Sequence, residues 1–451
     1  MRKGRSHSLK GLTKHLNTRN RAILAIALPA IITNITTPIL AMADLAIVGR
    51  LGSATYIGAI AVGSNLFNMV YWLLGFLRAG TSGLTAQAVG AGMTSRRDSI
   101  FYRGLIIGFL LGILALALSP LIAGIFVPFM EADAATSSLA ETYFLTVIWG
   151  APAYLASLAI SGWLLGNQNS VATLKIAVFI NISNILLSLF FVFVLGMKIK
   201  GVALGTCTSQ WLGCIYGLRI ALRQYRPAFS RWKAVFALPE LKLFFRLNSD
   251  IFLRTLCLVA VTLWFTRTGA QAGPDILAAN ALLMQLFMLF SFFMDGFAYA
   301  GEAIAGKEFG AGNMAELRRL EAALMKWGLA LSILGMAVYF LAGEWILRLL
   351  TEEESVMKVA RDYLPWAVTI PLCGFMAFIY DGIFIGLSLT RKLLLSMLFA
   401  IAVFFATYLL LFPLWGNNAL WLAFSLYLLT RGISQYFLLK KALPRGVNCH
   451  T

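Results

Sequence analysis

The sequence predicts an all-α membrane protein whose twelve transmembrane helices form two six-helix lobes, related by a pseudo-two-fold axis along the membrane normal. Three observations predict this fold: the composition, the number of long apolar runs and an internal duplication. Hydrophobic residues make up 60% of the 451 residues and charged residues only 12%. Soluble domains carry roughly 25% charged residues. The mean hydropathy of +0.81 agrees with a chain that lies mostly in lipid.

A membrane-spanning helix needs about 20 consecutive, mostly apolar residues. Twelve runs of this kind occur along the chain, so both termini are expected on the same side of the membrane. The expected helices span 22–49, 56–79, 101–128, 140–166, 171–195, 201–223, 247–267, 276–304, 322–350, 361–387, 393–413 and 418–439.

Basic residues gather in the tails and in the loops on the side of the termini, and these loops decide the orientation. The N-terminal tail is rich in Lys and Arg, and the longest inner loop, 224–246, is also basic. Acidic loops lie on the opposite side, as at Glu131 and Glu352. We therefore expect both termini in the cytoplasm. The net charge of +18 sits in these short loops, so we expect no nucleic-acid partner.

The second half of the chain repeats glycine patterns of the first half. Gly90 and Gly310 are separated by the same offset along the chain as Gly162 and Gly382. Six helices precede the basic loop and six follow it, so the halves share one orientation, as in parallel-repeat transporters. The expected domains are a cytoplasmic tail, an N-lobe, a linker, a C-lobe and a second tail, at residues 1–21, 22–223, 224–246, 247–440 and 441–451.

Asp44 is a carboxylate inside the first expected helix. That helix also carries Pro29, Pro38 and a polar patch that includes Asn34. An ionisable residue within a membrane helix costs several kcal/mol and usually marks a functional site. Burial disfavours the charged form of a carboxyl group. We therefore interpret Asp44 as a proton-binding switch on a helix that proline allows to bend.

Other polar residues in the same half form a candidate cluster around a substrate cavity. Asn181, Asn184 and Ser188 share one face of the fifth helix because they are three and four residues apart. Thr206, near the start of the sixth helix, is expected to face the same interior. These side chains either hydrogen-bond the Asp44 carboxyl group or only hold helices together.

In the second half, Asp381 lies inside the tenth helix, directly before Gly382. Asp250 and Arg254 are four residues apart on the seventh helix and are expected to pair along one face. The sequence contains no G-x-x-x-x-G-K-[ST] motif, so ATP is not the expected energy source. It also lacks a catalytic triad or metal-ligand pattern. We therefore expect a protein that is not an enzyme and that needs no metal or cofactor.

Several sequence strings, in order, resemble the multidrug and toxic compound extrusion (MATE) family, and most closely its DinF-type bacterial branch. The resemblance covers residues 20–440. The strings are Ala27-Leu-Pro29, Ala43-Asp44 with Val48-Gly49, Thr85-Ala-Gln87-Ala-Val-Gly90-Ala91-Gly92, Gly162-Trp-Leu-Leu-Gly166, Gly201-Val-Ala203-Leu-Gly-Thr206, Asp295-Gly296-Phe-Ala-Tyr-Ala and Asp381-Gly382-Ile-Phe-Ile-Gly386.

This resemblance implies an antiporter of the bacterial inner membrane that exports bulky, often cationic, drug-like compounds, driven by inward flow of protons or sodium ions. It implies that Asp44 is the coupling site and that the first helix bends at Pro29. A sodium-binding branch uses an acid in the seventh helix together with the acid matching Asp381. Here Arg254 takes the place of the first acid, so we favour proton coupling.

The leading hypothesis is therefore a proton-coupled exporter of amphipathic organic cations that works by alternating access, expected as a monomer in the lipid bilayer. Two alternatives stay open. One is a sodium-coupled drug exporter, and the other is a flippase for a lipid-linked precursor from the same superfamily.

Overall fold

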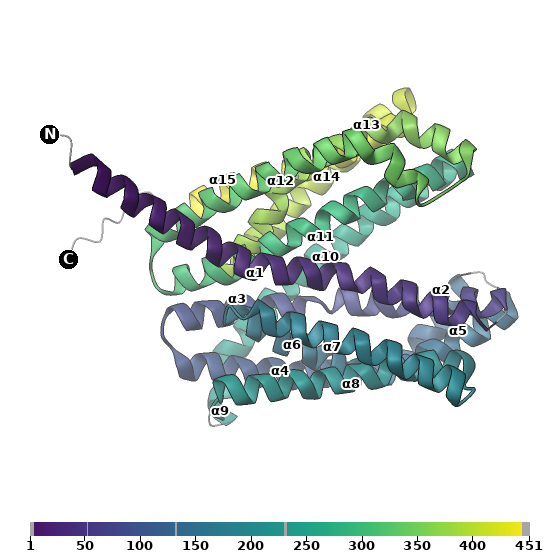
Figure 1. Ribbon diagram of the computed structural model, residues 1–451, viewed down its shortest axis with the longest axis horizontal. Coiled ribbons are helices and arrows are strands. Elements are labelled where there is room, and N and C mark those ends of the chain that lie inside the picture. Colours follow the sequence, from purple (N-terminus) through teal and green to yellow (C-terminus); the bar gives the residue numbers. More distant parts are fainter. Residues whose placement is uncertain (1–3, 52, 131–132, 230–231, 444–451) are drawn as a thin grey trace. The chain divides into compact units, whose positions relative to one another are not determined.

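The computed structural model describes residues 4–51, 53–130, 133–229 and 232–443, and these residues form helices and no strand (Figure 1). The helices are α1 (Gly4–Gly49), α2 (Ala54–Leu73), α3 (Phe76–Gly90), α4 (Thr94–Phe129), α5 (Ala134–Val147), η1 (Ile148–Gly150), α6 (Ala151–Gly166), α7 (Ser170–Leu189), η2 (Phe190–Val194), α8 (Lys198–Tyr225), α9 (Trp232–Val235), α10 (Leu238–Ala272), α11 (Pro274–Gly310), α12 (Met314–Arg348), α13 (Glu354–Gly386), α14 (Thr390–Trp415) and α15 (Asn417–Ala442).

The long helices follow the twelve predicted runs. Helices α2 and α3 together correspond to the second run, and α5, η1 and α6 to the fourth. Within the described residues, ten helical segments are long and apolar enough to cross a membrane. Helices α8 and α15, which correspond to the runs predicted at 201–223 and 418–439, complete the set of twelve.

The predicted helices were too short where a helix continues past its apolar run. The helix predicted at 101–128 begins at Thr94, and the helix predicted at 247–267 extends from Leu238 to Ala272. The second run also contains a break that the hydropathy pattern did not show. Helix α2 ends at Leu73 and α3 begins at Phe76. Polar residues continue a helix wherever its ends are solvated, so hydropathy marks the lipid-crossing part rather than the helix.

The chain divides into two compact units. We call Leu28–Asn248 the N-unit, and the residues up to Ala27 together with those from Ser249 onward the C-unit. Both boundaries fall inside long helices, the first within α1 directly before Pro29 and the second within α10. Helix α1 therefore contributes to both units.

The two units repeat the same close backbone contacts. A Cβ on Gly162 would lie 2.2 Å from the carbonyl oxygen of Arg78, and one on Gly382 would lie 2.0 Å from that of Ala298. Gly382 follows Gly162 along the chain by the same number of residues as Ala298 follows Arg78. In the N-unit α6 thus packs tightly on α3, and in the C-unit α13 packs tightly on α11. Glycine is required at both contacts because any side chain would collide with backbone.

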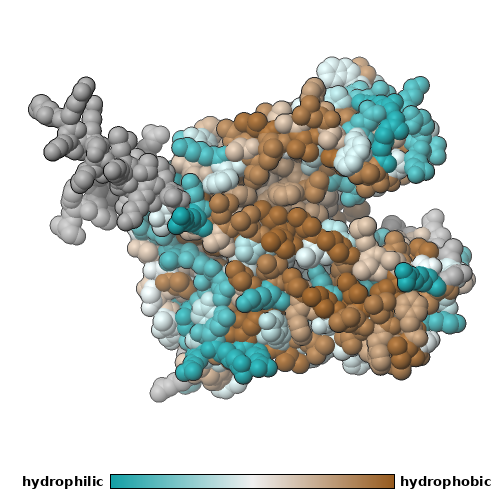
Figure 2. Space-filling model, in the orientation of Figure 1, coloured by the Kyte–Doolittle hydropathy of each residue, from teal (hydrophilic) through white to brown (hydrophobic). Residues whose placement is uncertain are grey.

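Large apolar side chains remain exposed on the outer faces of the helices, as expected for surfaces that face lipid. Leu341 is 81% exposed, Phe340 77% and Leu414 75%. Figure 2 shows hydrophobic side chains over the middle of the helices on this face and hydrophilic ones mainly toward the helix ends.

Candidate functional site

Asp44 lies on the part of α1 that belongs to the N-unit, C-terminal to Pro29. Its Oδ1 atom is buried and has no hydrogen-bond partner among the described residues. A buried charged carboxylate without hydrogen bonds is strongly unfavourable, whereas a neutral carboxyl group is less so. The surroundings of Asp44 therefore suit a group that holds a proton in this conformation.

Tyr143 on α5 is the titratable neighbour of Asp44 and interacts with it electrostatically. Only 3% of Tyr143 is exposed, and its ring packs among apolar residues that include Ile47 and Val48 of α1. The hydroxyl group of Ser64 on α2 lies 3.5 Å from the Tyr143 hydroxyl oxygen. Because a phenol both donates and accepts hydrogen bonds, Tyr143 can link Asp44 to further polar groups.

Those further groups form a buried hydrogen-bonded chain. The Tyr143 hydroxyl interacts with the side chain of Thr206 on α8. Asn184 on α7 donates its Nδ2 proton to Thr206 Oγ1 at 2.9 Å. Ser188 Oγ lies 3.5 Å from Asn184 Oδ1. The structure thus joins Asn184, Ser188 and Thr206 in one chain, and the Tyr143 hydroxyl interacts electrostatically with Asp44 without a hydrogen bond to it.

Glycines on two helices create the space that this chain occupies. A Cβ on Gly63 would lie 2.7 Å from Cδ1 of Tyr143, so the tyrosine ring fits only beside glycine. A Cβ on Gly205 would lie 2.3 Å from Ser188 Oγ, so α8 approaches α7 closely at this level. The glycine string that begins helix α8 therefore positions the polar chain.

Polar side chains also contact the backbone of the C-terminal half of α1, between Pro29 and Pro38. Thr33 Oγ1 donates to the carbonyl oxygen of Pro29 at 2.9 Å. Asn181 on α7 donates to the carbonyl oxygen of Thr36 at 3.4 Å, which joins α7 to α1. Asn34 is half-buried on α1, one turn before Pro38. Asn181 therefore contacts the α1 backbone and is not part of the chain formed by Asn184.

The C-unit contains a different polar site, centred on Asp381 of α13. Arg254 of α10 and Arg431 of α15 both form ion pairs with Asp381 Oδ2. Gln435 donates to Asp381 Oδ1 at 2.7 Å. The side chains of Asp381 and Arg431 are 9% and 4% exposed. One carboxylate thus faces two guanidinium groups, and the cluster keeps an excess of positive charge.

The predicted pairing of Asp250 with Arg254 is wrong. Asp250 instead accepts a hydrogen bond from Thr390 Oγ1 at 2.8 Å and lies 3.8 Å from an Arg391 nitrogen atom. Arg254 pairs with Asp381. A spacing of four residues permits contact along one helix face, but it does not show which partners neighbouring helices supply.

Tyr143, Ser64, Arg431 and Gln435 belong to these two sites and were not identified from the sequence. Arg431 had a clear signal, because it is a charged residue within the apolar run at 418–439. Tyr143 has a signal only as a repeat marker, since Tyr363 occupies the matching place in the second half. Ser64 and Gln435 had no signal that distinguishes them from other polar residues in membrane helices.

Comparisons with known proteins agree on one family. The MatE family model matches residues 29–199 and 250–411. The chain is 35% identical over 427 residues to the DNA damage-inducible protein F of Escherichia coli (strain K12), which covers 93% of this chain and 92% of that protein. It is 26% identical to a probable multidrug resistance protein NorM of Deinococcus radiodurans, covering 70% of this chain and 69% of that protein.

Solved structures share the fold. A crystal structure of MATE in the bent conformation superposes with a TM-score of 0.83 at 19% sequence identity, covering 94% of this chain and 95% of that one. A multidrug resistance MATE family transporter of the MOP superfamily in an outward-facing conformation gives a TM-score of 0.82 at 19% identity, covering 94% and 96%. These likenesses establish an all-α membrane fold of twelve helices in two lobes.

Proposed function

The chain belongs to the MatE family of multidrug efflux transporters, and we propose that it exports amphipathic organic cations in exchange for protons that bind at Asp44. Membership of the family makes the chain a multi-pass membrane transporter and not an enzyme. The identity of the coupling ion and the antiport mechanism are our proposal.

The observation that carries the proposal is the buried Oδ1 atom of Asp44, which has no hydrogen-bond partner among the described residues. Desolvation makes the charged form of such a carboxyl group costly. Any conformation that wets Asp44, or brings a cation to it, favours release of the proton. A ligand shifts a conformational equilibrium only through different affinities for the two states, and protonation of Asp44 offers such a difference.

The polar chain beside Asp44 supports a path for proton exchange. Tyr143, Thr206 and Asn184 follow one another within the N-unit as buried hydroxyl and amide groups. These groups donate and accept hydrogen bonds without carrying charge. They can stabilise either form of the carboxyl group as the proton leaves or returns. We assign Asp44 as the coupling residue and these neighbours as positioning residues.

The charge balance of the C-unit argues for protons over sodium ions. Asp381 is the acid that a sodium site in this unit would use. Its two oxygen atoms are already occupied by the guanidinium groups of Arg254 and Arg431 and by the amide of Gln435. A sodium ion placed here would meet two fixed positive charges at short range, where Coulomb repulsion in a low-dielectric interior is strong.

Transport by the purified protein in liposomes tests the proposal. Efflux of a fluorescent organic cation is measured under an imposed pH gradient and, separately, under a sodium gradient. We expect the pH gradient to drive efflux in the wild type, and Asp44→Asn to reduce this efflux to the level of protein-free liposomes. Asp362→Asn is the matched control, since Asp362 is an exposed carboxylate on α13, and it should transport like the wild type.

Thermal unfolding of Asp44→Asn shows whether the variant still folds. Full pH-driven efflux by a folded Asp44→Asn protein rules out the coupling role. Efflux that follows the sodium gradient and ignores the pH gradient replaces protons with sodium ions as the coupling ion. A protein that moves a lipid-linked precursor and no organic cation is a flippase instead.

We further propose that both termini lie in the cytoplasm of a bacterial cell whose inner membrane holds the transporter. Loops on the side of the termini contain most of the Lys and Arg residues, and such loops stay on the cytoplasmic side during insertion. Labelling of an engineered cysteine near residue 441 from outside intact cells would contradict this orientation.

A further inference from the structure

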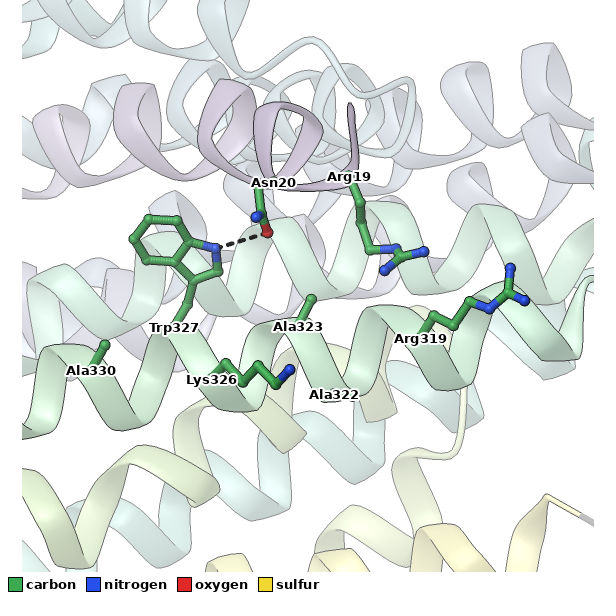
Figure 3. Close-up of a pocket in the computed structure, with 8 residues that line it drawn as sticks. All are labelled: Arg19, Asn20, Arg319, Ala322, Ala323, Lys326, Trp327 and Ala330. Carbon is green, nitrogen blue, oxygen red and sulfur yellow. Dashed lines mark hydrogen bonds between the residues drawn. The ribbon is translucent and has the colours of Figure 1, made fainter. Parts of the chain in front are cut away.

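A basic groove lies within the C-unit, between the N-terminal part of α1 and helix α12 (Figure 3). Its volume is about 600 Å³. Three cationic residues line it, together with a tryptophan, an asparagine and three alanines. They are Arg19, Asn20, Arg319, Ala322, Ala323, Lys326, Trp327 and Ala330. We call this cavity the α1–α12 groove, and it takes no part in the sites around Asp44 and Asp381.

Two contacts between α1 and α12 hold the groove together. Arg19 Nε lies 2.6 Å from Glu316 Oε1, with 12% of the arginine side chain exposed. Trp327 Nε1 donates to Asn20 Oδ1 at 3.2 Å, and Figure 3 shows this bond between the two helices. The small side chain of Ala323 leaves space between these two contacts. The walls are therefore built by specific interactions rather than by a chance gap.

The groove has more positive charge than its own acid neutralises. Glu316 is the acid beside it, and this residue pairs with Arg19 and, at 3.5 Å, with Arg319. Lys326 forms no ion pair with any described residue and is exposed. The Arg319 side chain is 68% exposed. Three cations against one acid leave two positive charges available to an anionic group.

The same face of α12 becomes apolar beyond the groove. The residues that line the groove on α12 recur at spacings of three and four, from Arg319 to Ala330, so they share one face. Ile333, Leu334 and Leu341 continue that face at the same spacing, and they are 58%, 59% and 81% exposed. A basic pocket therefore opens onto a hydrophobic strip on one helix, which is a pattern suited to an amphipathic anion.

We propose that the α1–α12 groove binds an anionic phospholipid, with its phosphate headgroup between Arg19, Arg319 and Lys326 and an acyl chain along the exposed apolar face of α12. Basic pockets between membrane helices at the cytoplasmic side are suited to anionic headgroups. Arginine binds phosphate oxygen atoms with two parallel hydrogen bonds, and the tryptophan beside it suits the membrane–water interface. This inference does not depend on the coupling ion.

Lipid binding is measured with the full-length purified protein exchanged into nanodiscs of phosphatidylcholine, to which phosphatidylglycerol with the same acyl chains is added. Native mass spectrometry counts retained lipid, and thermal unfolding reports stabilisation by bound lipid. We expect phosphatidylglycerol to be retained and to raise the unfolding temperature. Each removed charge should weaken binding about fivefold, so Arg319→Gln combined with Lys326→Gln should weaken it about 25-fold.

The matched control is the double variant Lys358→Gln and Lys441→Gln, which removes two exposed charges of the C-unit outside the groove. It should bind phosphatidylglycerol like the wild type. Equal retention by the groove variant and by this control overturns the proposal. Retention of phosphatidylcholine equal to that of phosphatidylglycerol also overturns it, because it indicates packing of the acyl chains alone. Stabilisation by soluble glycerol phosphate equal to that by phosphatidylglycerol overturns it too, because it indicates a site for free phosphate. The unfolding temperature without added lipid shows that both variants fold.

Discussion

Replacement of Asp381 should strongly destabilise the C-unit. Asp381→Asn preserves the shape of the side chain and removes the negative charge that faces Arg254 and Arg431. Two guanidinium groups, 12% and 4% exposed, then lack a counter-charge. Breaking a buried ion pair by removing one partner costs about 3–5 kcal/mol, because it leaves an uncompensated buried charge.

The expected loss corresponds to a decrease in unfolding temperature of about 6–20 °C for a unit of this size. The assay is thermal unfolding of the purified protein in one detergent, followed by intrinsic fluorescence. The charge count supplies an internal comparison. Arg254→Gln leaves one carboxylate facing one guanidinium group, so it should cost only roughly 1.5 kcal/mol, as for the loss of one charged hydrogen bond.

Combining the two substitutions should cost less than the sum of the single effects, because Arg254→Gln removes one of the charges that Asp381→Asn exposes. The reasoning fails if Asp381→Asn unfolds at the temperature of the wild type. It also fails if Arg254→Gln is the more damaging single change. In either case the carboxylate would not be the group that neutralises the cluster.

Two further predictions concern the polar chain and the helix contacts. Tyr143→Phe keeps the ring and removes the hydroxyl that interacts electrostatically with Asp44 and also with Thr206. pH-driven efflux in liposomes should fall about tenfold, which corresponds to about 1.4 kcal/mol, with little change in unfolding temperature. Unchanged efflux would exclude Tyr143 from the path. Gly382→Ala places a Cβ 2.0 Å from a backbone oxygen and should destabilise the protein by about 2 kcal/mol. Gly124 has open space around it, so Gly124→Ala should be neutral or stabilise the protein by up to about 1 kcal/mol. Equal unfolding temperatures for the two variants would contradict the close contact at Gly382.

The helices could be predicted from the sequence because lipid imposes a minimum length of apolar residues on each span. The duplication could be predicted for a related physical reason. Glycine is needed wherever two helices touch through backbone atoms, and the structure places Gly162 and Gly382 at such contacts. Local patterns of this kind depend on one helix or on one steric requirement, and the sequence records them directly.

The partners of buried polar residues could not be predicted in the same way. Asp250 and Arg254 are four residues apart, yet their partners, Thr390 and Asp381, come from helices far away along the chain. Tyr143 interacts electrostatically with Asp44 because α5 packs in the same unit, and nothing in the local sequence marks this interaction. Which polar groups meet inside a membrane protein depends on helix packing, so the composition of a site emerges only with the fold.

The two units differ in chemistry although their backbones pack alike. Helices α7 and α14 begin at Ser170 and Thr390, which are separated by the same offset as Gly162 and Gly382, so their positions correspond. Asn184 of the polar chain corresponds to Phe404, which is fully buried.

The same comparison at the next turn matches Ser188 with Tyr408, whose ring packs on the ring of Phe404. Conversely, Asp381 of the second half corresponds to Ser161 in the first half.

Close helix contacts require glycine in both halves, but no such requirement keeps the polar residues alike. One half therefore retains a neutral polar chain beside a single acid, which can gain and lose a proton. The other half holds an acid fixed between two permanent positive charges, where a proton would have to displace an ion pair. This division is the reason to expect proton coupling in the N-unit alone.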